Sequence, residues 1–156
     1  MADDDDTRRV AVEAHGLART LLAKPERSEE ETARMIGAAR ASLAAWEAIG
    51  GPVEAQRGNW LLARVYVDAG LNEPALEFAR RTMELTGAHQ AELADFDLAF
   101  AEEIAARAWA STGNVGRAEA HYHDAKRLGL AIKDADDRAE FFRQFGIGPW
   151  FGLDRL

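Results

Sequence analysis

Apolar residues recur at three- and four-residue spacing along most of the chain, in stretches that are rich in Ala and poor in β-branched residues. This period is that of an amphipathic helix, and no stretch shows the period-two alternation of a half-buried strand. The pattern therefore predicts an all-α fold. Turns rich in Gly, Pro and Asn separate helices expected at residues 8–24, 29–49, 53–69, 73–86, 91–112, 115–128 and 135–145.

Two parts of the chain resemble each other at an offset of 43 positions. The pairs in register are Ala63 with Ala106, Tyr66 with Trp109, Gly70 with Gly113, Ala75 with Ala118, Ala79 with Tyr122 and Leu85 with Leu128. A weaker third copy falls on residues 8–50. Self-similarity at such a period predicts stacked helical hairpins, and the helix at 135–145, with its stripe of Phe residues, is expected to cap the last one.

Residues 56–87 and 99–130 resemble the tetratricopeptide repeat, a helix–turn–helix unit of about 34 residues. The resemblance implies a right-handed superhelix of about three hairpins. It also implies close helix pairing at Ala63 and Ala106, and positive φ angles at Gly70 and Gly113. Because the period is longer than that of the family by about nine residues, we expect first helices, notably 91–112, about two turns longer than in the standard repeat.

The chain has 156 residues, no Cys and a net charge of −8. The lack of Cys excludes disulfides, zinc–thiolate sites and thiol nucleophiles. The acidic balance argues against nucleic acid or a membrane as the partner. We expect a disordered acidic segment at 1–7, a repeat domain at 8–146 and an aromatic tail at 147–156. In the alternative interpretation, the four Asp residues lie near the positive end of the first helix dipole and Thr7 is the N-cap. The start lacks an apolar signal segment, which predicts a cytoplasmic protein, and the dominance of Arg among basic residues is typical of GC-rich bacteria.

Residue spacings that carry catalysis or metal binding are missing from the sequence. His121 and His123 lie on opposite sides of their expected helix, so they cannot chelate one ion together. Glu102 and Glu103 have no acidic partner at catalytic spacing, and no phosphate-binding loop or nucleophile motif occurs. The sequence predicts a protein without enzymatic activity, metal or cofactor.

The resemblance to tetratricopeptide repeats places the first helix of each hairpin along a concave groove. The residues carried into this groove as a partner-binding site are Arg57, Trp60, Arg64, Phe100, Glu103 and Arg107. Arginine forks would orient acidic groups and the aromatic rings would supply apolar contact. In the alternative interpretation, Trp60 packs in the interior and the arginines pair with neighbouring carboxylates. The Lys/Asn set of family members that clamp a C-terminal carboxylate is absent.

Two functions follow from this groove. The leading hypothesis is a non-catalytic interaction module that binds a peptide or protein segment, and a long open channel would favour it. The alternative is a regulatory domain that senses a small molecule or signalling peptide, and a closed groove with one deep pocket would favour that one. A third and weaker hypothesis is an enzyme that uses histidine or carboxylate side chains in catalysis. The tail either folds back on its own chain or inserts into a second copy, which would make a homodimer.

Overall fold

The computed structural model describes residues 3–155, and within this range the chain is all-helical, as predicted. Met1, Ala2 and Leu156, which belong to the expected N-terminal segment and tail, lie outside it. The α-helices are α1 (Asp4–Leu22), α2 (Glu29–Ile49), α3 (Pro52–Asp68), α4 (Asn72–Ala88), α5 (Asp95–Ser111), α6 (Val115–Leu130) and α7 (Ala135–Phe145). Two short 3-10 helices are η1 (Gln90–Glu92) and η2 (Leu153–Arg155).

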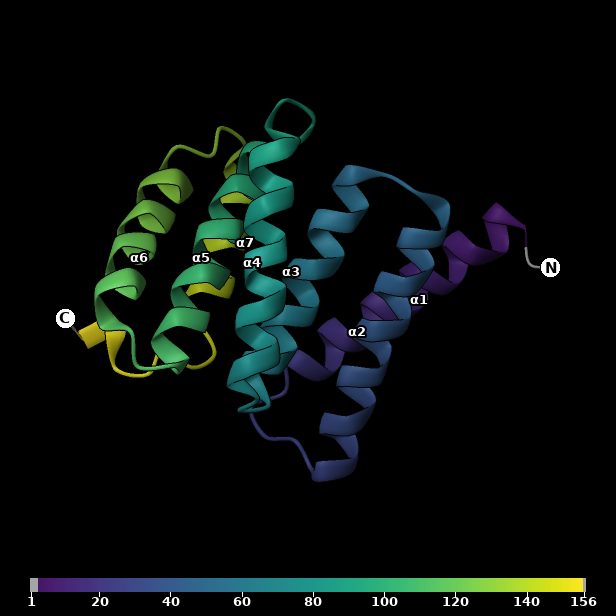
Figure 1. Cartoon of the computed structure of the whole chain (residues 1–156), viewed down its shortest axis with the longest axis horizontal. Coiled ribbons are helices and arrows are strands. Elements are labelled where there is room, and N and C mark those ends of the chain that lie inside the picture. The colour runs from purple at the N-terminus through teal and green to yellow at the C-terminus, as the bar shows by residue number, and fades with distance from the viewer. Residues whose placement is uncertain (1–2, 156) are drawn as a thin grey trace.

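Consecutive helices pair along the chain (Figure 1). The pairs are α1 with α2, α3 with α4, and α5 with α6, and α3 also packs against α1 and α5. The final helix, α7, packs against α5 and α6, as expected for a cap. Each helix thus buries an apolar face that it could not bury alone, and α3, in the middle, is buried along most of its length.

Residues 4–7 belong to helix α1, which corrects the disorder expected for them. Helix α1 begins at Asp4, and the Asp3 side chain accepts a hydrogen bond of 2.7 Å from the backbone N–H of Asp6. Asp3, and not Thr7, is therefore the N-cap. Three further Asp residues occupy the first turn, where their negative charge is stabilised by the positive end of the helix dipole.

The turns inside the second and third hairpins have the same geometry. Gly70 and Gly113 adopt φ angles of 76° and 84°, a region that residues with a Cβ rarely enter. After each glycine the next backbone N–H returns to the preceding helix, from Leu71 to the Tyr66 carbonyl at 3.0 Å and from Asn114 to the Trp109 carbonyl at 3.1 Å. The positive φ angles that the resemblance implies for Gly70 and Gly113 are thus confirmed.

The bounds expected for the helix at 91–112 are wrong, because α5 covers only Asp95–Ser111. Helix α5 has 17 residues, the same number as α3. Most of the expected extra length lies in η1 and in the two residues after it. Helix α5 begins at Asp95 because the Asp97 carboxylate accepts a hydrogen bond of 3.0 Å from the backbone N–H of Ala94, which closes the first turn there.

Two glycines that we interpreted as helix ends lie inside helices. Helix α4 continues through Gly87 to Ala88, and α6 continues through Gly129 to Leu130. Gly129 is buried, and a Cβ at this position would collide with the ring of Phe141 on α7. The glycine therefore permits close approach of α7 rather than ending α6. Over the described residues, no helix is both long and apolar enough to cross a membrane.

Candidate functional site

Glu103 is the centre of a buried polar cluster that joins α3 to α5. Its side chain is 0% exposed. One carboxylate oxygen accepts from the Trp60 indole N–H at 2.9 Å, and the other accepts from Arg64 at 3.0 Å and from Arg107. Arg64 also pairs with Asp68 at 3.1 Å. Trp60, Arg64, Glu103 and Arg107, which were predicted for the groove, therefore do lie together, but they bind one another in the interior of the protein.

The two buried arginines hold the C-terminal segment through its backbone. Arg64 donates to the Ile147 carbonyl at 3.0 Å, and Arg107 donates to the carbonyls of Ile147 at 2.8 Å and Pro149 at 3.0 Å. Arg107 also reaches the carbonyls at the end of α7. Burial lowers the pKa of Arg107 to about 10, and nearby Arg64 acts in the same direction while Glu103 opposes both.

The tail folds back on its own chain, one of the two alternatives left open by the sequence. Trp150 is 5% exposed, stacks over the Arg107 guanidinium at 4.0 Å and donates its indole N–H to the Phe145 carbonyl at 2.8 Å. Gly148 has a φ of 80°, and a Cβ there would collide with the Arg64 guanidinium. The backbone of the tail thus lies directly against the two arginines.

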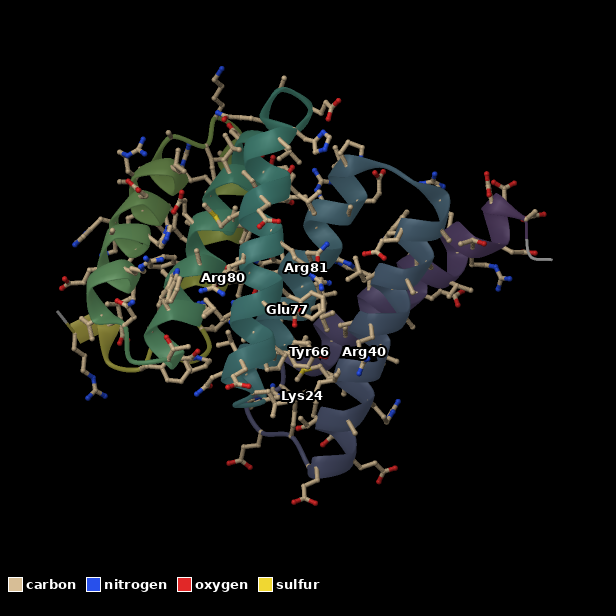
Figure 2. All side chains as sticks on the ribbon, viewed as in Figure 1. Lys24, Arg40, Tyr66, Glu77, Arg80 and Arg81 are labelled. Atoms are coloured by element: carbon tan, nitrogen blue, oxygen red, sulfur yellow. The ribbon has the colours of Figure 1, made fainter. Side chains whose placement is uncertain are left out.

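This arrangement changes the predicted groove. Arg64, Glu103 and Arg107 are at most 1% exposed, so they are not available to a ligand in this structure. By contrast, Arg81 forms an ordinary surface pair with Glu77 at 2.6 Å on α4 (Figure 2). Arg80 on the same helix lies with its guanidinium 5.1 Å from the centroid of the Trp109 ring. The alternative in which Trp60 and the arginines make internal pairs describes these residues better, although the pairs are buried and not on the surface.

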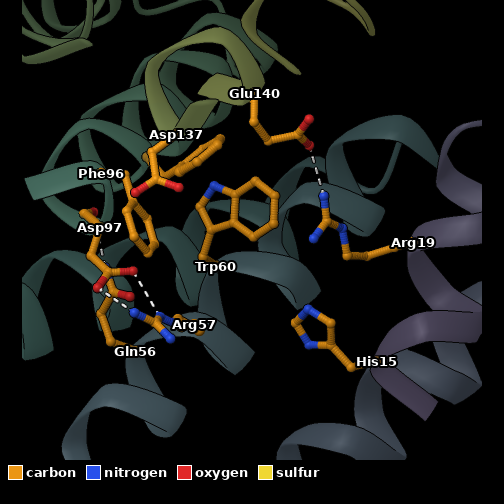
Figure 3. A pocket seen from close by; sticks show the side chains of 10 residues that line it. His15, Arg19, Gln56, Arg57, Trp60, Phe96, Asp97, Asp137 and Glu140 are labelled. Atoms are coloured by element: carbon orange, nitrogen blue, oxygen red, sulfur yellow. Dashed lines mark hydrogen bonds and ion pairs between the residues drawn. The ribbon is translucent and has the colours of Figure 1, made fainter. Parts of the chain in front are cut away.

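A cleft of about 160 Å³ remains open between four helices. Its lining residues are His15 and Arg19 from α1, Gln56, Arg57 and Trp60 from α3, Phe96, Asp97 and Phe100 from α5, and Asp137 and Glu140 from α7. Trp60 lies in the middle, with His15 and Arg19 on one side and Asp97 and Asp137 on the other (Figure 3). The rings of Trp60 and Phe100 meet edge to face, with centroids 5.0 Å apart.

Two ion pairs cross this cleft. Arg57 binds Asp97 through two hydrogen bonds of 2.9 Å, and its guanidinium lies 5.1 Å from the centroid of Phe96. These hydrogen bonds raise the pKa of Arg57. At the opposite rim Arg19 on α1 meets Glu140 on α7 at 3.0 Å. Both of these side chains are 40% exposed or more, so this contact contributes little to stability.

The two remaining titratable groups of the cleft differ in their surroundings. Burial lowers the pKa of His15 to about 4, and the charges of Arg19 and Arg57 add to this effect. The imidazole is therefore neutral at pH 7. Desolvation raises the pKa of Asp137, and the neighbouring carboxylates, first among them Asp134, act in the same direction.

Half of the sequence-predicted site lies at the cleft, namely Arg57, Trp60 and Phe100. The sequence analysis missed the contributions of α1 and α7. Asp97 and Phe96 carried no local signal either, because the sequence predicts a helix that begins at 91 and Ala94 has no side-chain oxygen that would mark an N-cap. No local pattern singles out His15, Arg19, Asp137 and Glu140, because they reach the cleft only through the packing of α1 and α7.

Elsewhere, His121 on α6 contacts Glu102 on α5 at 2.5 Å, so these two residues are joined across helices. Between residues 3 and 155, no three His, Asp or Glu side chains are placed to hold a metal ion together. Comparison with known proteins finds no matching family model, no matching curated protein and no matching solved structure.

Proposed function

We propose that this protein is a non-catalytic binding module that recognises a small ligand, or the end of a short peptide, in the cleft between α1, α3, α5 and α7. One observation carries the proposal: the cleft is open and lined by three aromatic rings, while the surface beside it is closed by the tail of the same chain. Its volume of about 160 Å³ is below the ~300–1,000 Å³ usual for drug-sized ligands. A ligand of amino-acid size suits it.

The proposal includes a tetratricopeptide-like architecture. Its support is the order of packed hairpins, the contacts of α3 with both α1 and α5, and the matching turns at Gly70 and Gly113. It also includes a cytoplasmic, bacterial setting, supported by the lack of Cys and the abundance of Arg among basic residues. The negative net charge supports a partner other than nucleic acid or a membrane.

A cleft-filling substitution tests this function. In His15→Trp the larger ring would occupy the cleft, whereas in the matched control His123→Trp the ring would lie on an exposed part of α6 that does not line it. We expect fragment-sized compounds to raise the melting temperature of the wild type and of His123→Trp, but not of His15→Trp. If no compound binds the wild type, or if all three proteins respond alike, the cleft is not the binding site.

A second candidate is the peptide-binding groove of the leading sequence hypothesis, with the tail as its resident occupant. It is favoured by the way Arg64 and Arg107 bind main-chain carbonyls of an irregular segment, as they would bind those of a partner peptide. A synthetic peptide of residues 146–156 should then bind the full-length Trp150→Ala variant more tightly than the wild type. Equal binding, or none, would count against a groove opened by displacement of the tail.

A further inference from the structure

The cleft has one carboxylate more than its internal ion pairs use. Arg57 is paired with Asp97, and Arg19 is paired with Glu140. His15 is neutral at pH 7 because burial lowers its pKa to about 4. Among the described residues that line the cleft, Asp137 is therefore the one charged side chain without an oppositely charged partner. The lining as a whole carries a net formal charge of −1.

The aromatic rings of the cleft add to this negative character. The face of an aromatic ring attracts a cation within about 6 Å of its centroid. Trp60, Phe96 and Phe100 all line the cleft, and the Arg57 guanidinium already lies 5.1 Å from the centroid of Phe96. The guanidinium of Arg57 thus already lies against the ring of Phe96. The other two line the same space, in which Asp137 is unpaired (Figure 3).

We propose that the ligand of this cleft is a small organic cation, an ammonium group carried on an apolar body. The inference rests on the proposed function, since it names the ligand of the same site. Asp137 supplies the opposite charge, and Trp60 and Phe100 supply faces for the cation and its apolar body. A free amine and the side chain of a lysine in a peptide both present this chemistry.

An anionic ligand fits the same cleft less well. Arg57 is held by Asp97 in two parallel hydrogen bonds, and Asp97 is only 3% exposed, so separating them would leave a buried carboxylate unpaired. Arg19 pairs with Glu140 at the exposed rim, where Arg143 also holds Glu140, and an anion at Arg19 would have to displace that carboxylate. A cation can be bound without breaking either pair, because its partner carboxylate is free.

The test uses the full chain labelled with ¹⁵N, and it follows the indole N–H signal of Trp60, the one tryptophan that lines the cleft. Three probes share a phenylethyl-sized body and differ in charge: phenethylamine, 2-phenylethanol and phenylacetate. At neutral pH we expect phenethylamine to have a Kd roughly tenfold lower than either of the others, with an affinity that falls as salt is added. A fourth probe, the capped tripeptide acetyl-Ala-Lys-Ala-amide, distinguishes a peptide source from a free amine.

Two variants test whether Asp137 supplies the negative charge that binds the ligand. Asp137→Asn keeps the size of the side chain and the backbone hydrogen bond to Asp134, and it should weaken phenethylamine binding roughly tenfold while leaving 2-phenylethanol unchanged. The matched control is Asp136→Asn, which removes an exposed charge beside the cleft and should change neither. Both variants carry the same net charge, so a general effect of charge would appear in both.

The outcomes separate the two proposals. If 2-phenylethanol binds as tightly as phenethylamine, the cationic ligand is wrong and the binding cleft stands. Tighter binding of phenylacetate, or an Asp137→Asn variant that behaves like Asp136→Asn, also overturns the cationic ligand. If none of the probes shifts the Trp60 signal, both the ligand class and the binding cleft are wrong.

Discussion

The buried carboxylate of Glu103 offers the sharpest test of how this fold is held together. It accepts hydrogen bonds from Trp60, Arg64 and Arg107, and it and both arginines are at most 1% exposed. In Glu103→Gln the side chain keeps its size but loses its charge, and its new amide N–H₂ group is a donor facing donors. The two guanidinium groups are left close together with Asp68 as their nearest remaining carboxylate partner.

The expected loss is large because the charges cannot reach water. Removing one partner of a buried ion pair destabilises proteins by about 3–5 kcal/mol. For a chain of this length, that corresponds to a melting temperature lower by roughly 10 °C. The neighbouring variant Glu102→Gln is a matched control, since Glu102 is half-buried and, among the described residues, pairs with His121 near the protein surface. It should cost about 1 kcal/mol or less.

Urea unfolding followed by circular dichroism gives both free energies of unfolding under the same conditions, and equal m-values would show that the same surface unfolds in each case. Near-ultraviolet circular dichroism reports whether the aromatic side chains, Trp150 on Arg107 among them, remain packed. The reasoning is refuted if Glu103→Gln loses less than about 1 kcal/mol, or no more than Glu102→Gln, because the buried arginines would then be satisfied without Glu103.

Three further predictions test other contacts, each by urea unfolding. Gly148→Ala and Gly152→Ala both place a Cβ at a positive φ, of 80° and 87°, but only the Cβ at 148 meets other side chains. Gly148→Ala should therefore lower the free energy of unfolding by at least about 1 kcal/mol more than Gly152→Ala. Equal losses would contradict packing of the tail on the arginines. His15 has a folded-state pKa of about 4, below its usual 6.5, so the unfolded chain binds the proton first and stability falls as the pH drops through this window. Between pH 7 and pH 5 the wild type should therefore lose about 1–2 kcal/mol more than His15→Gln, and parallel losses would show that His15 is not buried as a neutral ring. Gly129→Ala should cost about 1–3 kcal/mol by pushing Phe141 away, whereas Gly116→Ala, with open space at its Cβ, should cost nothing.

The amino-acid sequence was sufficient for the helical class and for the register of the second and third hairpins. Periodicity and turn residues are local properties, and for this reason the turns at Gly70 and Gly113 could be anticipated. Two errors concern helix ends, and only the first of them has a local cause. Asp3 caps the first helix better than Thr7 does because it precedes a full acidic turn, and Gly129 is retained inside a helix because another helix packs on it.

The candidate site depended on tertiary structure. The resemblance to tetratricopeptide repeats implied that one set of residues on α3 and α5 belongs together, namely Arg57, Trp60, Arg64, Phe100, Glu103 and Arg107. It could not show which of them face solvent, since that depends on where the tail lies. Arg64 and Arg107 hold the tail through its backbone carbonyls, which every residue has, so no pattern of side chains in the tail predicts this contact. Likewise His15 and Asp137 are separated by most of the chain, and only the packing of α1 and α7 against α3 and α5 brings them to one cleft.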